Sequence, residues 1–138
     1  MKILALSLMV ALALTGSDKV KKPKISVKAS PAMAISPARV VASADITGGP
    51  DDFEEFYCAA IEWEWGDDTK STSSADCDPY EPGKSQIKRR FTADHTYRTS
   101  GDFRIQFRLK KKDKSIAGAS TSVRIRPGIG DPGGDSPR

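Results

Sequence analysis

In the stretch WEWGDDT, residues 63–69, two tryptophans alternate with a glutamate, and a glycine and two aspartates follow them. Successive strand residues point to opposite faces, so Trp63 and Trp65 share one face and the glutamates share the other. A glycine followed by aspartates is typical of a tight turn, because glycine accepts a positive φ and aspartate bonds nearby backbone N–H groups. The stretch is therefore either an acidic binding loop or a buried strand that ends in a turn.

The sequence on both sides of this stretch alternates between apolar and polar residues, as half-buried strands do. Residues 103–109 are the clearest case, with four apolar side chains on one face and Arg, Gln and Arg on the other. Similar alternation recurs in residues 25–29, 40–46, 61–65 and 123–126. Residues 86–91 are less regular, which predicts a bulge or an edge strand. No window has the period of an amphipathic helix, so we predict an all-β chain of antiparallel sheet.

The two ends of the chain differ in composition from the middle. Lys2, an apolar run of twelve residues at 3–14 and the small residues after it match a secretory signal peptide. The run falls short of the roughly 20 residues of a membrane span, so we expect an exported protein, periplasmic or secreted, with no span. The predicted units are a signal peptide at 1–16, a basic linker at 17–23, one domain at 24–127 and a disordered Gly/Pro-rich tail at 128–138.

The two cysteines, Cys58 and Cys77, predict a disulfide, because export permits one and the cysteine count is even. A hairpin that turns between Asp67 and Asp68 pairs residues whose numbers sum to 135, as 58 and 77 do. The cysteines would then face each other within disulfide reach. A zinc site is excluded because His95 is the only histidine and no CxxC is present.

The net charge is +4, and basic residues cluster at 19–24, 88–90 and 108–112. Such runs can bind nucleic acid or anionic surfaces. Export argues against a nucleic-acid partner, and a solvated basic face is the commoner reason for such runs. We therefore expect no nucleic-acid binding.

Three motifs together resemble the PKD domain family, whose members are immunoglobulin-like β-sandwiches of about seven antiparallel strands. The family patterns W-x-F-G-D-G, H-x-Y and G-x-Y are similar to residues 63–68, 95–97 and 101–103, in the same order. The residues that carry the resemblance are Trp63, Trp65, Gly66, Asp67, His95, Tyr97, Gly101 and Phe103. The sequence departs from the family pattern at Trp65, where phenylalanine is usual, at Asp68, where glycine is usual, and at Phe103, where tyrosine is usual.

The resemblance implies a non-catalytic module, without a cofactor, that contacts protein or carbohydrate outside the cell. The resemblance also predicts that both tryptophans are core residues and that Gly66 and Asp67 lie in a turn. Some members of the family are said to bind calcium, so Asp67 and Asp68 are also a candidate calcium site with oxygen ligands from nearby loops.

The loop GGPDDFEEFY, residues 48–57, is the candidate contact surface for a protein or carbohydrate ligand. Its Phe53, Phe56 and Tyr57 are interpreted as exposed aromatic contacts. The alternative is that these rings fold back over the end of the sandwich.

Catalysis has little support in the sequence. His95 lacks a recognisable nucleophile, and its neighbour Asp94 points to the opposite face of the strand. Glu62 and Glu64 are predicted on an exposed sheet face, paired across strands with Arg104 or Arg108 rather than acting as a carboxylate pair.

We therefore predict that the chain is not an enzyme. A structural envelope-associated protein with a calcium-stabilised turn and no soluble ligand remains the alternative function.

Overall fold

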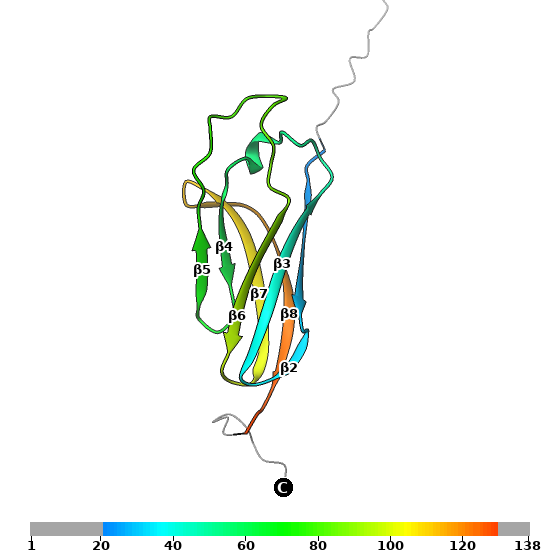
Figure 1. The fold of residues 1–138 in the computed structure, drawn as a ribbon, viewed down its shortest axis with the longest axis vertical. Helices are drawn as coiled ribbons and strands as arrows, with labels where there is room; N and C mark the ends of the chain where they lie inside the picture. The colour runs from blue at the N-terminus through cyan, green and yellow to red at the C-terminus, as the bar shows by residue number, and fades with distance from the viewer. Residues whose placement is uncertain (1–20, 130–138) are drawn as a thin grey trace, which may run out of the picture.

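The computed structural model describes residues 21–129, which form two β-sheets packed face to face (Figure 1). The predicted signal peptide, most of the predicted linker and nearly all of the predicted tail lie outside the described residues. The three-stranded sheet has the order β1-β3-β6, and the five-stranded sheet has the order β2-β8-β7-β4-β5. No α-helix occurs within residues 21–129. The chain is thus an all-β sandwich, as predicted.

The elements of the described chain follow the alternation seen in the sequence. They are β1 (Lys24–Ser30), β2 (Met33–Ile35), β3 (Ala38–Thr47), the 3₁₀ turn η1 (Glu54–Phe56), β4 (Ala60–Glu64), β5 (Lys70–Ser73), β6 (Arg90–Tyr97), β7 (Gly101–Lys111) and β8 (Lys114–Arg126). There are eight strands in this region instead of about seven, because a proline at position 31 divides the first strand. Its second part, β2, joins the other sheet and pairs with β8 in parallel, the exception to the antiparallel pairing.

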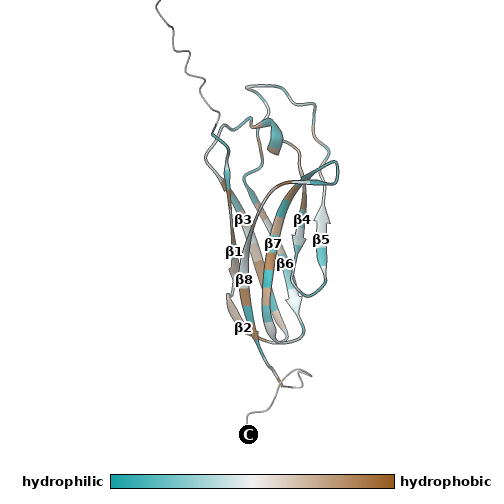
Figure 2. Ribbon diagram, turned by 180° about the vertical axis from the view of Figure 1, so that it is seen from behind, coloured by the Kyte–Doolittle hydropathy of each residue, from teal (hydrophilic) through white to brown (hydrophobic). Residues whose placement is uncertain are grey.

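The core lies between the sheets and comes mainly from every second residue of three long strands. Figure 2 shows hydrophobic segments along β3, β7 and β8, and a pale to hydrophilic β5. The buried side chains from these strands are Ala38, Val40, Ala42, Ala44, Ile46, Ile105, Phe107, Leu109, Val123 and Ile125. Trp63 and Trp65, each 1% exposed, belong to the same core, so the prediction that they are core residues is confirmed.

The hairpin between β4 and β5 has a different register from the predicted one. Trp63 pairs with Ser71 and Glu64 with Lys70, so paired numbers sum to 134 and not 135. The Trp65 N–H donates to the Thr69 carbonyl at 3.1 Å, which closes a turn of three residues centred on Asp67. A three-residue turn shifts every pair by one relative to the two-residue turn that was assumed.

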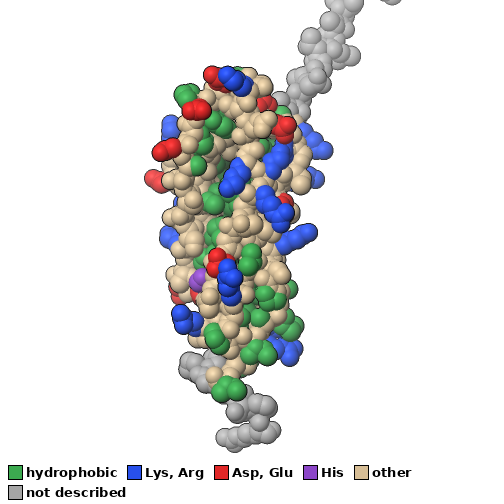
Figure 3. Space-filling view, viewed as in Figure 1, with side chains coloured by type: hydrophobic (Ala, Val, Ile, Leu, Met, Phe, Trp, Pro, Cys, Tyr) green, Lys and Arg blue, Asp and Glu red, His purple; other side chains and the backbone are tan. Residues whose placement is uncertain are grey.

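Edge strands and surface composition differ between the two sides of the sandwich. β6 is an edge of the three-stranded sheet, and β5 is an edge of the five-stranded sheet. Of the irregular residues 86–91, for which a bulge or an edge strand was predicted, Arg90 and Phe91 begin β6 and the other four precede it. On the opposite side, β1 packs beside β8. Charged side chains are spread over the face in Figure 3, and a strip of hydrophobic side chains runs between them along the region of β4 to β6 in Figure 1.

Candidate functional site

The turn at residues 66–68 is built by backbone conformations that its side chains permit. Gly66 has φ of +86°, and a Cβ there would lie 2.8 Å from the Arg104 carbonyl oxygen, so this close approach requires glycine. Asp68 has φ of +64°, a left-handed conformation that aspartate adopts more readily than most residues. Asp68 thus takes the backbone role of the glycine that is usual in the resembled motif.

Asp67 points from the turn toward the three-stranded sheet. Its carboxylate accepts hydrogen bonds from the Thr69 N–H at 3.2 Å and from the Thr69 hydroxyl. His95 Nε2 lies 2.7 Å from the other oxygen, and the imidazole must donate there because an ionised carboxylate only accepts. Partial burial raises the pKa of Asp67, but the bonds from Thr69 and His95 outweigh it and hold the pKa below its ordinary value of 3.8. The turn is therefore tied to β6 through a carboxylate that favours its charged form.

His95 is held by rings on two sides. Its imidazole stacks on Trp65 at 4.8 Å between ring centres, and its edge meets Tyr97 at 4.8 Å. A catalytic relay needs an acid on one ring nitrogen and a nucleophile on the other. Here Asp67 and the Thr69 hydroxyl both face Nε2, and that hydroxyl also bonds to Asp67. The arrangement fixes a turn and lacks the geometry of a relay.

The other residues of the resembled motifs surround this turn. The Tyr97 hydroxyl donates to the Trp65 carbonyl oxygen at 2.6 Å, and burial followed by the charge of Asp67 raises the pKa of Tyr97. Phe103 stacks on Tyr97 at 4.5 Å, and Gly101 precedes it at the start of β7. The ring of Phe103 therefore packs on the tyrosine that bonds to the strand end before the turn.

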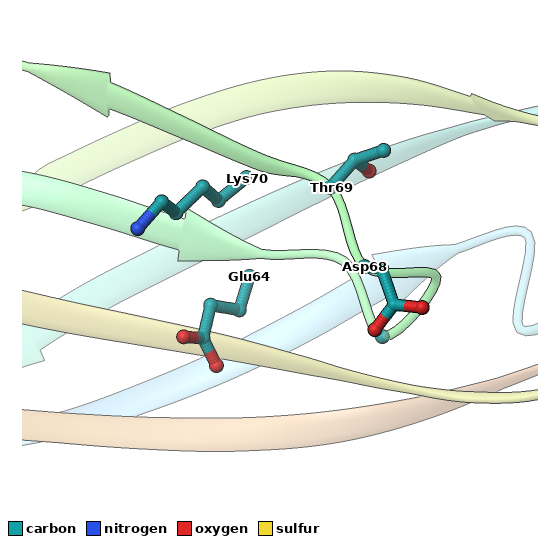
Figure 4. Close-up of a pocket in the computed structure, with 5 residues that line it drawn as sticks. Glu64, Asp68, Thr69 and Lys70 are labelled. Carbon is teal, nitrogen blue, oxygen red and sulfur yellow. The ribbon is translucent and has the colours of Figure 1, made fainter.

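The two aspartates proposed as calcium ligands have different surroundings. Asp67 is engaged by His95 and Thr69, whereas Asp68 lines an open hollow of about 340 Å³ with Glu64 and Lys70 (Figure 4). Glu64 is directed to the same side of the hairpin as Asp68, and Lys70 extends from β5. No group of three or more His, Cys, Asp or Glu side chains within residues 21–129 is arranged to hold a metal ion. Calcium at this turn stays a prediction.

The carboxylates of β4 form an ion-pair network on the outer face of the five-stranded sheet. Arg108 Nη1 lies 3.1 Å from Glu62 and 2.9 Å from Glu64, so Arg108 bridges both. Its hydrogen bond to Glu64 is the main reason that the pKa of Glu64 is lowered. The predicted exposure of Glu62 is wrong: the residue is 6% exposed, because Arg108 and Lys110 cover it. Arg104 instead donates to the Ser120 hydroxyl. Of the two arginines predicted to pair with these glutamates, Arg108 is therefore the one that does so.

The predicted disulfide between Cys58 and Cys77 is confirmed, but its position differs. Both cysteines lie beyond the paired segment of β4 and β5, with a Cα–Cα distance of 6.0 Å. The bond joins the loop before β4 to the loop after β5 at one end of the sandwich.

The aromatic residues of the loop at 48–57 do not share one environment. Phe56, predicted to be exposed, is 4% exposed and belongs to the core. Phe53 packs edge-on against it at 5.0 Å, and both cover the end of the sandwich, as the alternative interpretation held. Tyr57 is half-buried beside Tyr80 at 5.5 Å and donates to the Asp78 carbonyl at 2.7 Å. Phe56 is thus removed from the candidate contacts, and Phe53 and Tyr57 remain partly accessible.

An open hollow of about 630 Å³ lies at this end of the molecule, and we call it the end hollow. It is lined by Lys21, Pro50, Asp52, Phe53, Glu54, Glu55 and Tyr80. The Tyr80 hydroxyl donates to the Asp52 carbonyl, which joins the loop after β5 to the acidic loop. The sequence analysis did not identify Tyr80 as a residue of this surface. The predicted disulfide at Cys77, three residues earlier, was a signal that the loop after β5 meets the loop before β4.

Comparisons with known proteins identify the fold. No family model and no curated protein matches the sequence. The structure is similar to the PKD domain of an M14-like peptidase from Thermoplasmatales archaeon SCGC AB-540-F20, with a TM-score of 0.51 and 12% identity. The match covers 78% of this chain and 99% of that domain. The chain therefore has the immunoglobulin-like β-sandwich fold of a PKD domain. Within the described residues no helix is both long and apolar enough to cross a membrane.

Proposed function

We propose that this chain is an exported, non-catalytic β-sandwich module that contacts a protein or carbohydrate of the cell envelope or exterior through the end hollow. The end hollow carries the proposal, because it brings two partly exposed aromatic rings, Phe53 and Tyr80, beside three carboxyl groups. Such rings provide apolar contact area, and carboxylates accept hydrogen bonds from hydroxyl groups or pair with basic side chains.

Two observations support the other parts of the proposal. The Cys58–Cys77 disulfide fits an oxidising compartment outside the cytoplasm. His95, the single histidine, stabilises a turn, because Asp67 and Thr69 both lie at its Nε2. This structural role of the histidine favours a binding function of the chain over catalysis.

The first test is retention of the purified chain on a panel of insoluble polysaccharides, cell-wall fractions and immobilised envelope proteins. We expect retention on one of them, and Phe53→Ala should weaken it by about tenfold, as loss of a central aromatic contact does. The matched control is Ile35→Ala, which removes an exposed apolar residue, 64% accessible, on β2 at the other end of the sandwich. An unfolding curve for each variant separates lost binding from lost stability.

Three outcomes distinguish the parts of this proposal. Equal losses in Phe53→Ala and Ile35→Ala would place binding elsewhere than the end hollow. No retention on any material would contradict a contact function. Repeating the assay with calcium and with chelator tests Asp67 and Asp68 as calcium ligands, because only a calcium-dependent module would lose retention in chelator.

A further inference from the structure

The sandwich has an open side between β5 and β6. These edge strands belong to different sheets and do not pair with each other. An open groove of about 260 Å³ runs between them, and we call it the side groove. The hydrophobic strip in Figure 3 lies in this region. The side groove shares no lining residue with the end hollow, so binding at the side groove does not depend on the proposed function.

The floor of the side groove is apolar and its walls are polar. Ile61, Trp63, Phe91 and Ala93 line the floor, and the hydroxyl-bearing residues 71–73 line one wall. Ile61, Phe91 and Ala93 are only partly buried although they pack against the core. A ligand that covered this floor would remove apolar surface from water, which favours binding.

The strands beside the groove each have one free edge. Within residues 21–129, β5 pairs only with β4 and β6 only with β3, so one row of backbone N–H and C=O groups on each strand has no ladder partner there. An extended chain can add to such an edge, because its own backbone groups complete the ladder. β6 offers eight residues for this pairing and β5 offers four.

Beneath the groove a buried hydrogen-bond donor has no partner. Trp63 is 1% exposed, and its indole N–H is without an acceptor within residues 21–129. The neighbouring Trp65 differs, since its indole N–H donates to the Ser71 hydroxyl at 3.0 Å. Buried donors are normally paired, so the Trp63 indole N–H is exceptional within the described residues, but less than 1 Å² of its nitrogen is accessible and a ligand in the groove does not reach it without a shift of the ring.

The charge of the rim indicates what kind of chain would fit. Lys88 lies 5.1 Å from the centre of the Phe91 ring and makes no ion pair within the described residues. Arg90 is 71% exposed in its side chain and has only a 3.8 Å pair with Asp45. No aspartate or glutamate is among the residues that line the groove. A partner segment with acidic side chains would therefore complement it.

We propose that the side groove docks an extended, acidic segment of a partner protein. The segment adds as a strand to the free edge of β6 and fills the space between β6 and β5. Its apolar side chains cover Ile61 and Phe91, and its acidic side chains meet Lys88 and Arg90.

The test begins with selection of peptides of about twelve residues, enough to span a strand, from a random display library against the purified chain. We expect the selected peptides to alternate apolar and acidic residues. Fluorescence anisotropy should show binding weakened by about tenfold or more in Lys88→Glu, because an attraction becomes a repulsion. The matched control is Lys28→Glu, which reverses an exposed lysine on β1, on the side of the sandwich where β1 packs beside β8. It should change binding by less than about twofold.

Amide and indole chemical shifts locate the binding site independently of the variants. On addition of a selected peptide, the β6 amides and the Trp63 indole N–H should shift together. The proposal is overturned if no acidic peptide is selected or if Lys28→Glu weakens binding as much as Lys88→Glu. Shifts confined to the loop at 48–57, or side-groove shifts produced by a polysaccharide and by no peptide, would overturn it as well.

Discussion

Asp67 is the residue that connects the turn after β4 to the opposite sheet. It accepts from its own loop through Thr69 and from β6 through His95, and these bonds lower its pKa. Its neighbour Asp68 makes no side-chain hydrogen bond or ion pair within residues 21–129, although it also lies in the turn. Two adjacent carboxylates therefore have different roles, one structural and one exposed to the solvent.

Asp67→Asn should lower the free energy of unfolding at neutral pH by about 1–3 kcal/mol, because hydrogen bonds to a charged group are lost. The folded-state pKa of Asp67 lies below 3.8, so its charged form stabilises the fold above that pH, and the contribution is lost as pH falls through the folded-state pKa. Urea unfolding from pH 7 to pH 2 should show the gap between wild type and variant closing below about pH 4. A gap that stays constant with pH would contradict this role.

Asp68→Asn is the matched control for that experiment. Asparagine also tolerates the φ of +64° at this position, so the backbone of the turn is preserved. The variant should change the free energy of unfolding by less than about 0.5 kcal/mol, since the carboxylate has no partner to lose.

At the scale of elements, the register between β4 and β7 decides where the charged groups of the outer face meet. Glu62 pairs directly with Arg108, and Glu64 pairs with Gln106, which lies on the same strand as the arginine. The long guanidinium reaches both carboxylates from one strand. The alternation in the sequence placed these groups on one face, and the strand pairing made Arg108 the shared partner.

Removing Arg108 tests this pairing. Arg108→Ala should lower the free energy of unfolding by about 1–3 kcal/mol, because it leaves the buried carboxylate of Glu62 with Lys110 as its remaining cation. The loss should be much smaller when Glu62→Gln is already present, and a double-mutant cycle measures that coupling. The exposed pair Arg124–Asp102 is the control, with an expected coupling of about 0–1 kcal/mol. Equal couplings for the two pairs would show that burial of Glu62 has no energetic consequence.

At the scale of the whole molecule, the disulfide holds together the loops that form one end of the sandwich. It links residues 19 positions apart and lies outside the strand ladder, so hydrogen bonds between strands do not duplicate it. Tyr57, next to Cys58, and Tyr80, three residues after Cys77, pack against each other. The bond therefore supports both the stability of the chain and the shape of the end hollow.

Reduction of Cys58–Cys77 should lower the free energy of unfolding by about 3 kcal/mol, the chain-entropy value for a loop of this length. Denaturant unfolding with and without reductant measures the difference. The double variant Cys58→Ser, Cys77→Ser should be as unstable as the reduced chain and should not respond to reductant. Unchanged stability of the wild type in reductant would contradict the prediction.

The sequence alone determined the all-β class, the inward tryptophans, the pairing of the cysteines and the resemblance that gave the fold. Alternation and motif spacing are local properties, so they can be seen in a single chain without its tertiary contacts. The prediction that Trp63 and Trp65 are buried was correct for this reason. If the strand had turned its other face inward, it would have placed Glu62 and Glu64 in the core instead.

Tertiary structure alone decided the features that depend on turn geometry and on which strands become neighbours. A three-residue turn shifts the β4–β5 register by one from the predicted one. It forms because Gly66, which lies against β7, and Asp68 both adopt positive φ. The packing of the loops buried Phe56 and brought Tyr80 to Phe53. Sheet order left the outer edges of β5 and β6 without a neighbouring strand within the described residues, on either side of a groove that Trp63 lines. Such long-range contacts have no local pattern in the sequence, because their free energy comes from residues that only folding brings together.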